Sequence, residues 1–312
     1  MTKPMSKPAP KRMSKVAARR RWRESGLAVA MLAPSGVILG MFVIYPLVKA
    51  IFLGRQRCGV TSCRTTSWHQ YVDAFRSNEF QDALIVTIKY ALITVPIGLV
   101  LGVGLAVLAD KYVKGVGIFR TIFSSTVATS VAVASVMWFF LLNPNVGVIA
   151  DWLGGTAKTP GFLQDPDTAL FAVSASSIWA NLGFTFIVVT AGLQSVPKDL
   201  YESAYVDGAN GFTRFTNVTL PMISPVLLFV TVVLTARAFE SFGEIDLLTG
   251  GGPTVKGTGK TTTLTYLAYG KGLPTSIDDG LRATVTVLLF FVLLILALIQ
   301  FRGLEKRVHY GN

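Results

Sequence analysis

Six long stretches without a charged residue limit what this chain can fold into more than any other feature of its sequence. These stretches are Gly26–Val48, Tyr90–Ala109, Thr121–Leu142, Ala169–Ser195, Phe215–Ala236 and Ala283–Phe301. A helix of about 20 residues crosses the ~30 Å hydrocarbon layer of a bilayer. With their flanking residues included, we expect an all-α membrane protein whose six transmembrane helices cover about residues 26–53, 83–109, 118–142, 169–195, 215–242 and 281–301.

The composition of the chain supports a membrane protein and argues against a soluble one. Hydrophobic residues make up 51% of the 312 residues and charged residues only 15%, whereas soluble domains are about 25% charged. The net charge is +12, but nine of the 29 basic residues lie in residues 1–25, directly before the first apolar stretch. A basic segment in that place sets orientation and binds anionic lipid. We therefore expect membrane lipid as a partner and no nucleic acid.

The distribution of Lys and Arg between the loops predicts the orientation of the chain. If the N-terminus is cytoplasmic, the inside segments 1–25, 110–120, 196–214 and 302–312 hold seventeen basic residues, and the outside segments hold eight. Basic residues are enriched in cytoplasmic loops. We therefore expect a basic cytoplasmic segment at 1–25, a transmembrane domain at 26–301 and a cytoplasmic tail at 302–312.

The longest predicted cytoplasmic loop, residues 197–221, has the pattern of two short helices joined by a sharp corner. Pro197 suits the first turn of a helix, and acidic residues follow it, which is favourable at that end. Apolar residues recur four positions apart and so share one helix face; they are Leu200, Tyr201, Ala204 and Tyr205. Gly208 and Gly211 then end the first helix and permit the corner.

The order of residues in this loop resembles a family motif. The residues that carry the resemblance are Glu202, Ser203, Ala204, Gly208, Val218, Leu220 and Pro221. Their spacing is that of the E-A-A-x3-G-x9-I-x-L-P loop of ABC importer permeases, with Ser203 in place of an alanine and Val218 in place of an isoleucine. An ordinary pair of surface helices would not explain why the spacing matches this motif and why the loop also lies on the predicted cytoplasmic side, as it does in the family.

The resemblance implies a type I ABC importer permease fold with a cytoplasmic coupling helix and both termini in the cytoplasm. It also implies a place in a bacterial cytoplasmic (inner) membrane and three kinds of partner. These are a second homologous permease subunit, two copies of an ABC ATPase, and an extracytoplasmic substrate-binding protein. The chain is then not an enzyme and holds no cofactor, because ATP and Mg belong to the ATPase subunits. ATP-driven movement of the loop would tilt the adjoining spans.

Further stretches narrow the resemblance to permeases of the maltose and glycerol-3-phosphate type. They are Tyr45-Pro46, Leu247-Leu-Thr-Gly-Gly-Gly-Pro253, Thr261-Thr-Thr263 and the tail Gln300–Tyr310. The tail is most similar to the Ugp-type permease A subunit. This similarity implies import of a glycerol phosphate ester, which is either glycerol-3-phosphate or a glycerophosphodiester. Import of a sugar or oligosaccharide is the alternative that stays open.

Two charged residues mark a candidate solute cavity. Arg237 and Glu240 are three residues apart near the predicted outer end of the fifth span. A charge within a bilayer costs about 2.5–3.5 kcal/mol on insertion scales, so such residues face a protein interior or a partner. Three interpretations stay open: the two side chains pair with each other, both extend to the membrane surface, or Arg237 binds a phosphate of the solute. A guanidinium is well shaped to bind a phosphate. Together with Glu240, the positions that the resemblance places around the solute are Ala180, Asn181, Phe184, Arg237, Ala238, Ser241 and Gly243.

Other chemistry has less support in the sequence. Cys58 and Cys63 lie in the predicted first outer loop, where a disulfide and two free thiols both fit. Thr254–Thr261 nearly reads as a P-loop, but Thr254 replaces its first glycine and no strand precedes it. No spacing of His and Cys predicts a metal site. A proton-coupled carrier and a membrane-embedded enzyme are the alternatives from other classes, and neither explains the loop 197–221.

Overall fold

The computed structural model describes residues 15–58, 63–65, 68–110, 115–149, 161–255, 258–269 and 279–304. The chain divides into two compact units, residues 1–52 and 53–312, which we describe separately.

The described part of the first unit, from residue 15 onward, is a continuous run of helix. Its elements are α1 (Lys15–Leu39), a π-helical turn η1 (Gly40–Ile44) and α2 (Tyr45–Leu53). In the π-helical turn, the amide of Tyr45 donates to the carbonyl of Gly40, five residues back. The next residue, Pro46, has no amide hydrogen to donate, and the wider turn carries the helix past it. The apolar part, Gly26–Leu53, is long enough to cross a membrane, and none of it is buried within the chain.

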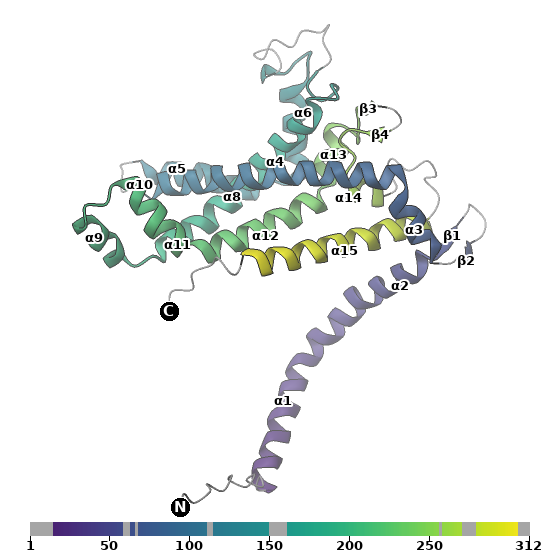
Figure 1. Cartoon of the computed structure of the whole chain (residues 1–312), viewed down its shortest axis with the longest axis horizontal. Helices are drawn as coiled ribbons and strands as arrows, with labels where there is room; N and C mark the ends of the chain where they lie inside the picture. Colours follow the sequence, from purple (N-terminus) through teal and green to yellow (C-terminus); the bar gives the residue numbers. More distant parts are fainter. Residues whose placement is uncertain are drawn as a thin grey trace, which may run out of the picture. The chain divides into compact units, whose positions relative to one another are not determined.

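The second unit is mainly helical (Figure 1). In chain order its helices are α3 (His69–Arg76), α4 (Asn78–Ala109), α5 (Val116–Ser125), η2 (Thr126–Ala128), α6 (Val131–Leu142), α8 (Ala169–Gln194), α9 (Lys198–Val206), α10 (Gly211–Arg214), η3 (Phe215–Thr219), α11 (Leu220–Met222), α12 (Ser224–Glu240), α13 (Gly243–Leu248), α14 (Leu264–Ala268) and α15 (Asp279–Leu304). Two antiparallel ribbons are also present, β1 (Gln56–Cys58) with β2 (Cys63–Thr65) and β3 (Thr254–Val255) with β4 (Thr258–Gly259).

Four helices of the described chain are long and apolar enough to cross a membrane by themselves. They are Gly26–Leu53, Asn78–Ala109, Ala169–Gln194 and Asp279–Gly303. The third and fifth predicted spans are instead bent pairs of helices. Val116–Ala128 meets Val131–Leu142 at 106°, and Gly211–Met222 meets Ser224–Glu240 at 70°. By length and composition, the described residues therefore hold four helices that could cross a membrane, or up to six spans if each bent pair counts as one.

Both bends have a local cause in the sequence. At the first bend Thr129 is extended, with φ −80° and ψ 125°. The side chain of Ser130 then accepts a hydrogen bond from the amide of Val133 and caps a new helix. At the second bend Ile223 lies between α11 and α12, and Pro225, which has no amide hydrogen, stands in the first turn of α12. A new helix begins at each of these places.

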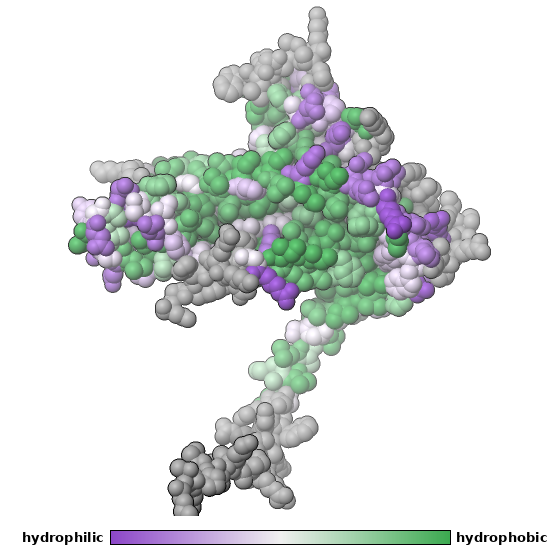
Figure 2. Space-filling model, viewed as in Figure 1, coloured by the Kyte–Doolittle hydropathy of each residue, from purple (hydrophilic) through white to green (hydrophobic). Residues whose placement is uncertain are grey.

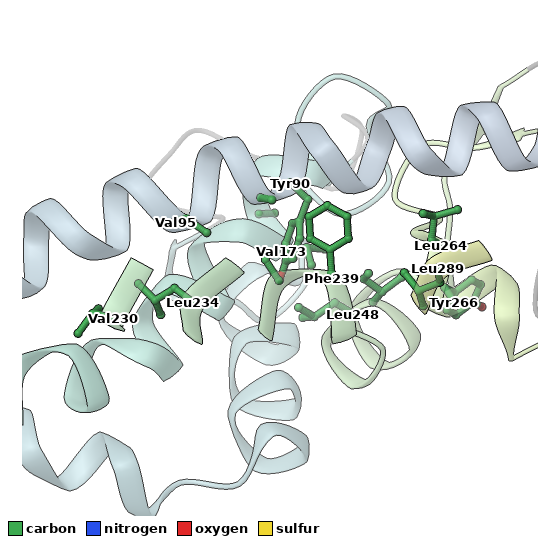
Figure 3. Packing of buried hydrophobic residues seen from close by; sticks show 14 of the residues in the cluster. Tyr90, Val95, Val173, Val230, Leu234, Phe239, Leu248, Leu264, Tyr266 and Leu289 are labelled. Carbon is green, nitrogen blue, oxygen red and sulfur yellow. The ribbon is translucent and has the colours of Figure 1, made fainter. Parts of the chain in front are cut away.

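The core of the second unit lies where α4, α8 and α12 pack together, with α15 against α12 (Figure 1). The side chains of Tyr90, Val173, Val230 and Phe239 are buried there (Figure 3). Gly102 of α4 lies so close to Thr185 of α8 that a methyl group at position 102 would overlap the threonine. A residue without a side chain therefore lets the two helices approach.

The surface of the second unit separates by polarity (Figure 2). Apolar side chains cover the long helices, and hydrophilic side chains gather around α9 and α10 at one end and around α3 at the other (Figures 1 and 2). Exposed apolar residues on these helices include Leu92 and Val100 of α4, Phe229 of α12 and Ile295 of α15. An apolar surface between two polar ends is what a lipid bilayer requires.

Candidate functional site

The loop that carries the family motif projects from one end of the second unit (Figure 1). We call residues 198–214, which comprise α9, α10 and the turn between them, the knob. The side-chain oxygen of Asn210 accepts a hydrogen bond from the amide of Thr213 at 2.9 Å and caps α10. Gly208 turns the corner with φ +76°, in a region that favours glycine. The two short helices and the glycine corner that the sequence predicts are therefore present.

The knob exposes apolar side chains beside the motif residues. Tyr205 is 73% exposed, Val206 84% and Phe212 77%. Glu202 and Ser203 are exposed as well. The sequence predicts one shared apolar face for α9, but only part of that face packs against the core, since Tyr201 does so and Tyr205 does not. Exposed apolar groups next to polar ones are typical of a surface that binds another protein.

The two halves of the motif lie in different parts of the structure. Glu202, Ser203, Ala204 and Gly208 belong to the knob, whereas Val218 lies in η3, and Leu220 and Pro221 lie in α11. The second half therefore forms the connection from the knob to the bend before α12. Ala204 is half-buried, and its carbonyl accepts from the amide of Ala209 at 2.9 Å, which closes the corner.

A cavity of about 550 Å³ lies between the bend after α5, the middle of α8 and the turn from α12 to α13. Seven of the eight residues proposed from the sequence line it: Ala180, Asn181, Phe184, Arg237, Glu240, Ser241 and Gly243. The eighth, Ala238, is 4% exposed and lines a much smaller neighbouring cavity that also touches Asn181. Residues of α8 and residues at the end of α12, which are far apart in sequence, therefore line the same cavity.

Arg237 is held at the wall of this cavity by two contacts. Its Nη1 donates a hydrogen bond to Oδ1 of Asn181 at 2.7 Å. Its guanidinium carbon lies 4.4 Å from the centre of the Phe184 ring, which is a cation–π contact. Asn181 is fixed in turn, because its Nδ2 donates to the carbonyl of Ser177 at 2.9 Å. An arginine has five N–H groups, so others stay available to an anionic ligand.

Arg237 and Glu240 do not form an ion pair, although both line the cavity. Within the part of the chain that the structure describes, ion pairs join Arg57 to Asp73 and Arg282 to Asp279. The pairing that the sequence left open between Arg237 and Glu240 is therefore not present in this structure. Arg237 instead presents its charge to the cavity.

A second carboxylate at the cavity was not expected from the sequence. Glu244 lines the cavity and is 8% exposed. Its Oε2 accepts a hydrogen bond from the hydroxyl of Ser241 at 2.8 Å, and the Ser241 hydroxyl lies 3.2 Å from the hydroxyl of the buried Tyr90. This network fixes the turn that follows α12. Sequence reasoning missed Glu244 because it lies beyond the apolar run, in the short helix α13.

The Gly-Gly-Pro stretch and the threonine run are tied to each other and to the cavity. The hydroxyl of Thr261 donates to the carbonyl of Gly252 at 2.6 Å, and that of Thr262 donates to the carbonyl of Gly251 at 3.0 Å. The hydroxyl of Thr263 donates to the carbonyl of Ser241 at 3.2 Å. Two stretches that carry the family resemblance therefore hold the end of α12 in place.

Other sequence predictions concern the loops. Cys58 and Cys63 occupy partner positions in the β1–β2 ribbon, but their side chains lie outside the described residues, so a disulfide stays a prediction. In Thr254–Thr261, residues 254–255 and 258–259 form the β3–β4 ribbon, and residues 260–261 form a turn. Among the residues that the structure describes, no three His, Cys, Asp or Glu side chains gather as a metal site.

Comparison with known families and structures fits this geometry. Residues 71–310 match the model of the family described as binding-protein-dependent transport system inner membrane component. The chain is 34% identical over 295 residues to the sn-glycerol-3-phosphate transport system permease protein UgpA of Salmonella choleraesuis, covering 94% of this chain and 97% of that protein. It is 32% identical over 289 residues to the UgpA protein of Agrobacterium fabrum, covering 91% and 97%.

The fold has a close counterpart among solved structures. A chain of a bacterial ABC transporter involved in the import of the acidic polysaccharide alginate matches with a TM-score of 0.76 and 25% identity, covering 92% of this chain and 99% of that chain. The alginate transporter in complex with its alginate-bound periplasmic protein matches with a TM-score of 0.74. The chain therefore belongs to the binding-protein-dependent inner membrane components, which are the permease subunits of ABC importers, and has their type I fold.

Proposed function

We propose that this permease translocates a glycerol phosphate ester, either glycerol-3-phosphate or a glycerophosphodiester, in an ATP-driven importer. The observation that carries the proposal is the position of Arg237, which is fixed by Asn181 and Phe184 at the wall of the ~550 Å³ cavity. A guanidinium binds a phosphate through two parallel hydrogen bonds and attracts its charge. The UgpA relatives, whose names state sn-glycerol-3-phosphate transport, support the same solute class.

Import of a sugar or oligosaccharide is the second candidate, and the carboxylates of the cavity favour it. Glu240 and Glu244 lie beside Arg237 at the cavity and are suited to accept hydrogen bonds from hydroxyl groups. They would repel a phosphate that carries two negative charges. The matched alginate transporter supports a carbohydrate as the solute, but alginate is an acidic polysaccharide, so this match does not argue against an anion at the cavity. The two solute classes therefore need a direct comparison.

The knob is the surface through which we expect ATP hydrolysis to drive the permease. Glu202, Tyr205, Val206 and Phe212 would fit a cleft on an ATPase subunit, with one of two ATPase copies beneath this chain. A second homologous permease subunit would complete the pathway, and an extracytoplasmic binding protein would deliver the solute. ATP and Mg would be bound by the ATPase subunits. This arrangement places the knob and both termini on the cytoplasmic side of a bacterial inner membrane.

Reconstitution of the complete importer in liposomes tests the solute class. The complex of this chain, the second permease and the ATPase is supplied with its binding protein, and uptake of sn-glycerol-3-phosphate, a glycerophosphodiester and a disaccharide is measured. We expect ATP-dependent uptake of a phosphate ester and none of the disaccharide. Uptake of the disaccharide alone would favour the second candidate. Uptake that persists without the ATPase would contradict the importer mechanism and indicate a carrier.

A further inference from the structure

A side-chain hydrogen bond links α9, the first helix of the knob, to η3, which follows the knob in the chain. The hydroxyl of Tyr201 in α9 lies 3.1 Å from the hydroxyl of Thr219 in η3. No other side-chain hydrogen bond joins α9 to η3 within the described residues. The hydroxyl of Thr219 also donates to the carbonyl of Arg214 at 3.4 Å, so its oxygen can accept from Tyr201. Tyr201 therefore ties α9 to a point 18 residues further along the chain.

This contact is partly shielded from water, which strengthens it. Thr219 is 6% exposed, and the ring of Tyr201 packs against the core of the second unit. A hydrogen bond between shielded groups is stronger than one in water, and a polar group that loses its partner there costs free energy. By contrast, the neighbouring Tyr205 is 73% exposed. Tyr205 contacts Arg214 within the knob, whereas Tyr201 is the tyrosine of α9 that bonds to η3 and packs against the core.

The partner of Tyr201 lies directly before the bend that leads into α12. The carbonyl of Thr219 accepts a hydrogen bond from the amide of Ile223 at 3.0 Å, and Ile223 is fully buried at the bend. α12 starts at Ser224 and carries Arg237 near its other end. The connection from the knob to the cavity therefore runs from α9 through Tyr201 and Thr219 to the bend and then along α12.

The backbone alone is a weak link in this connection. Residues 215–219 form the π-helical turn η3, and π-helical turns are rare, short and often found at functional sites. Such a turn can change its hydrogen-bond pattern when the knob is displaced. Without a second attachment, a tilt of α9 would be absorbed in η3 before it reached α12. The bond between Tyr201 and Thr219 bridges this turn.

We propose that Tyr201 is a positioning residue for energy coupling. Its hydrogen bond to Thr219 makes the knob and the start of α12 move together, so that ATPase movement reaches the solute cavity. The proposal rests on the proposed importer function, and it assigns Tyr201 a role different from that of the exposed side chains of the knob. Tyr201 transmits the movement, whereas Tyr205, Val206 and Phe212 bind the ATPase.

A double-mutant cycle tests the proposal in the reconstituted complete importer. The variants are Tyr201→Phe, Thr219→Val and the double variant, and the measured quantity is sn-glycerol-3-phosphate imported per ATP hydrolysed. Each single variant should lower this ratio about 2- to 10-fold, which is the effect of one net hydrogen bond of ~0.5–1.5 kcal/mol. The double variant should lower it no further, because both substitutions remove the same bond. The ATPase should still copurify with every variant.

Tyr45→Phe is the matched control, because it removes a phenolic hydroxyl from an exposed ring outside the knob. The ratio of solute imported to ATP hydrolysed by the Tyr45→Phe complex should equal the ratio for the unsubstituted complex. An unchanged ratio in Tyr201→Phe would overturn the proposal. A double variant whose fold-loss equals the product of the two single fold-losses would also overturn it, because the two side chains would then act independently. Loss of the ATPase from Tyr201→Phe would assign Tyr201 to docking instead. Failure of the unsubstituted complex to import sn-glycerol-3-phosphate would contradict the proposed function. This outcome is therefore distinct from the outcomes that contradict the role of Tyr201.

Discussion

At the scale of single residues, the arrangement around Arg237 was predictable in part. The charge of Arg237 within an apolar run identified it from the sequence, and the family resemblance added Asn181 and Phe184. The sequence could not show that Asn181 accepts its hydrogen bond, because the two residues are 56 positions apart. The contact of Ser241 with Tyr90 spans 151 positions and was not predicted. Contacts of this kind depend on how α4, α8 and α12 pack.

Arg237→Ala should weaken uptake of a phosphate ester. The substitution removes the cation at the cavity and leaves Asn181 without its recorded side-chain donor. The loss of charged hydrogen bonds worth ~1.5–3 kcal/mol should raise the apparent KM for the phosphate ester about 10- to 100-fold. Arg237→Lys should restore part of the affinity, because it keeps the charge and loses the planar fork. Unchanged uptake by Arg237→Ala, with the ATPase still bound, would remove Arg237 from the solute site.

Ser241→Ala should destabilise the second unit. Its hydroxyl bonds to both Glu244 and Tyr90, and all three residues are buried. Without it, the carboxylate of Glu244 loses a buried donor, which should cost about 1–3 kcal/mol. Thermal unfolding of the purified complex, followed by loss of soluble protein, measures the effect. Ser203→Ala is the control, since the Ser203 side chain is exposed and its removal should change stability by less than ~0.5 kcal/mol.

At the scale of helices, the apolar runs predicted where membrane segments lie but not how each one is built. The break at Thr129 and Ser130 contains neither proline nor glycine, so nothing in a search for apolar runs reveals it. It arises because Ser130 caps a new helix and α6 packs on α13. Pro225 does mark the second break, yet a proline also permits a simple kink. Only the packing of neighbouring helices distinguishes a kink from a 70° bend.

The close packing of α4 on α8 gives a test at this scale. Gly102→Ala should destabilise the protein by about 1–3 kcal/mol, because the added methyl group would overlap Thr185 and push the helices apart. Gly104→Ala is the matched control on the same helix, since nothing lies within 4 Å of the added methyl group there. The purified Gly102→Ala variant should therefore melt at a lower temperature than the Gly104→Ala variant. Equal values would contradict the close approach at Gly102.

The knob gives a second test at this scale. Val206→Asp and Phe212→Asp place a charge on apolar side chains that are 84% and 77% exposed. Neither should disturb folding, but each should abolish copurification of the ATPase, since a buried interface excludes an unpaired charge. Val148→Asp, at a residue that is 74% exposed outside the knob, should leave the ATPase bound. An ATPase that still copurifies with both knob variants would show that it binds elsewhere.

At the scale of the whole molecule, the apolar helices, the knob and the cavity belong to one arrangement. The knob connects through α11 and α12 to Arg237, and the threonine run fixes the far end of α12. The end of α12 next to Ser241 is therefore fixed. A movement of the knob at the other end would tilt α12 about this fixed end. Alternating access requires such a rigid element between the ATPase and the solute site. Neither a carrier nor a membrane-embedded enzyme needs an exposed apolar knob.

The orientation of the chain in the membrane is the prediction on which this arrangement depends. Seventeen basic residues in the segments expected inside, against eight in those expected outside, predict that the knob is cytoplasmic and that the Gly-Gly-Pro stretch is outside. Ser203→Cys in the knob and Thr254→Cys in β3 introduce single exposed thiols once Cys58 and Cys63 are replaced by serine. A maleimide that does not cross membranes should label position 254 in intact spheroplasts, and position 203 only in inverted vesicles. Labelling of position 203 from outside would put the knob beyond the reach of a cytoplasmic ATPase, and the coupling mechanism would fail with it.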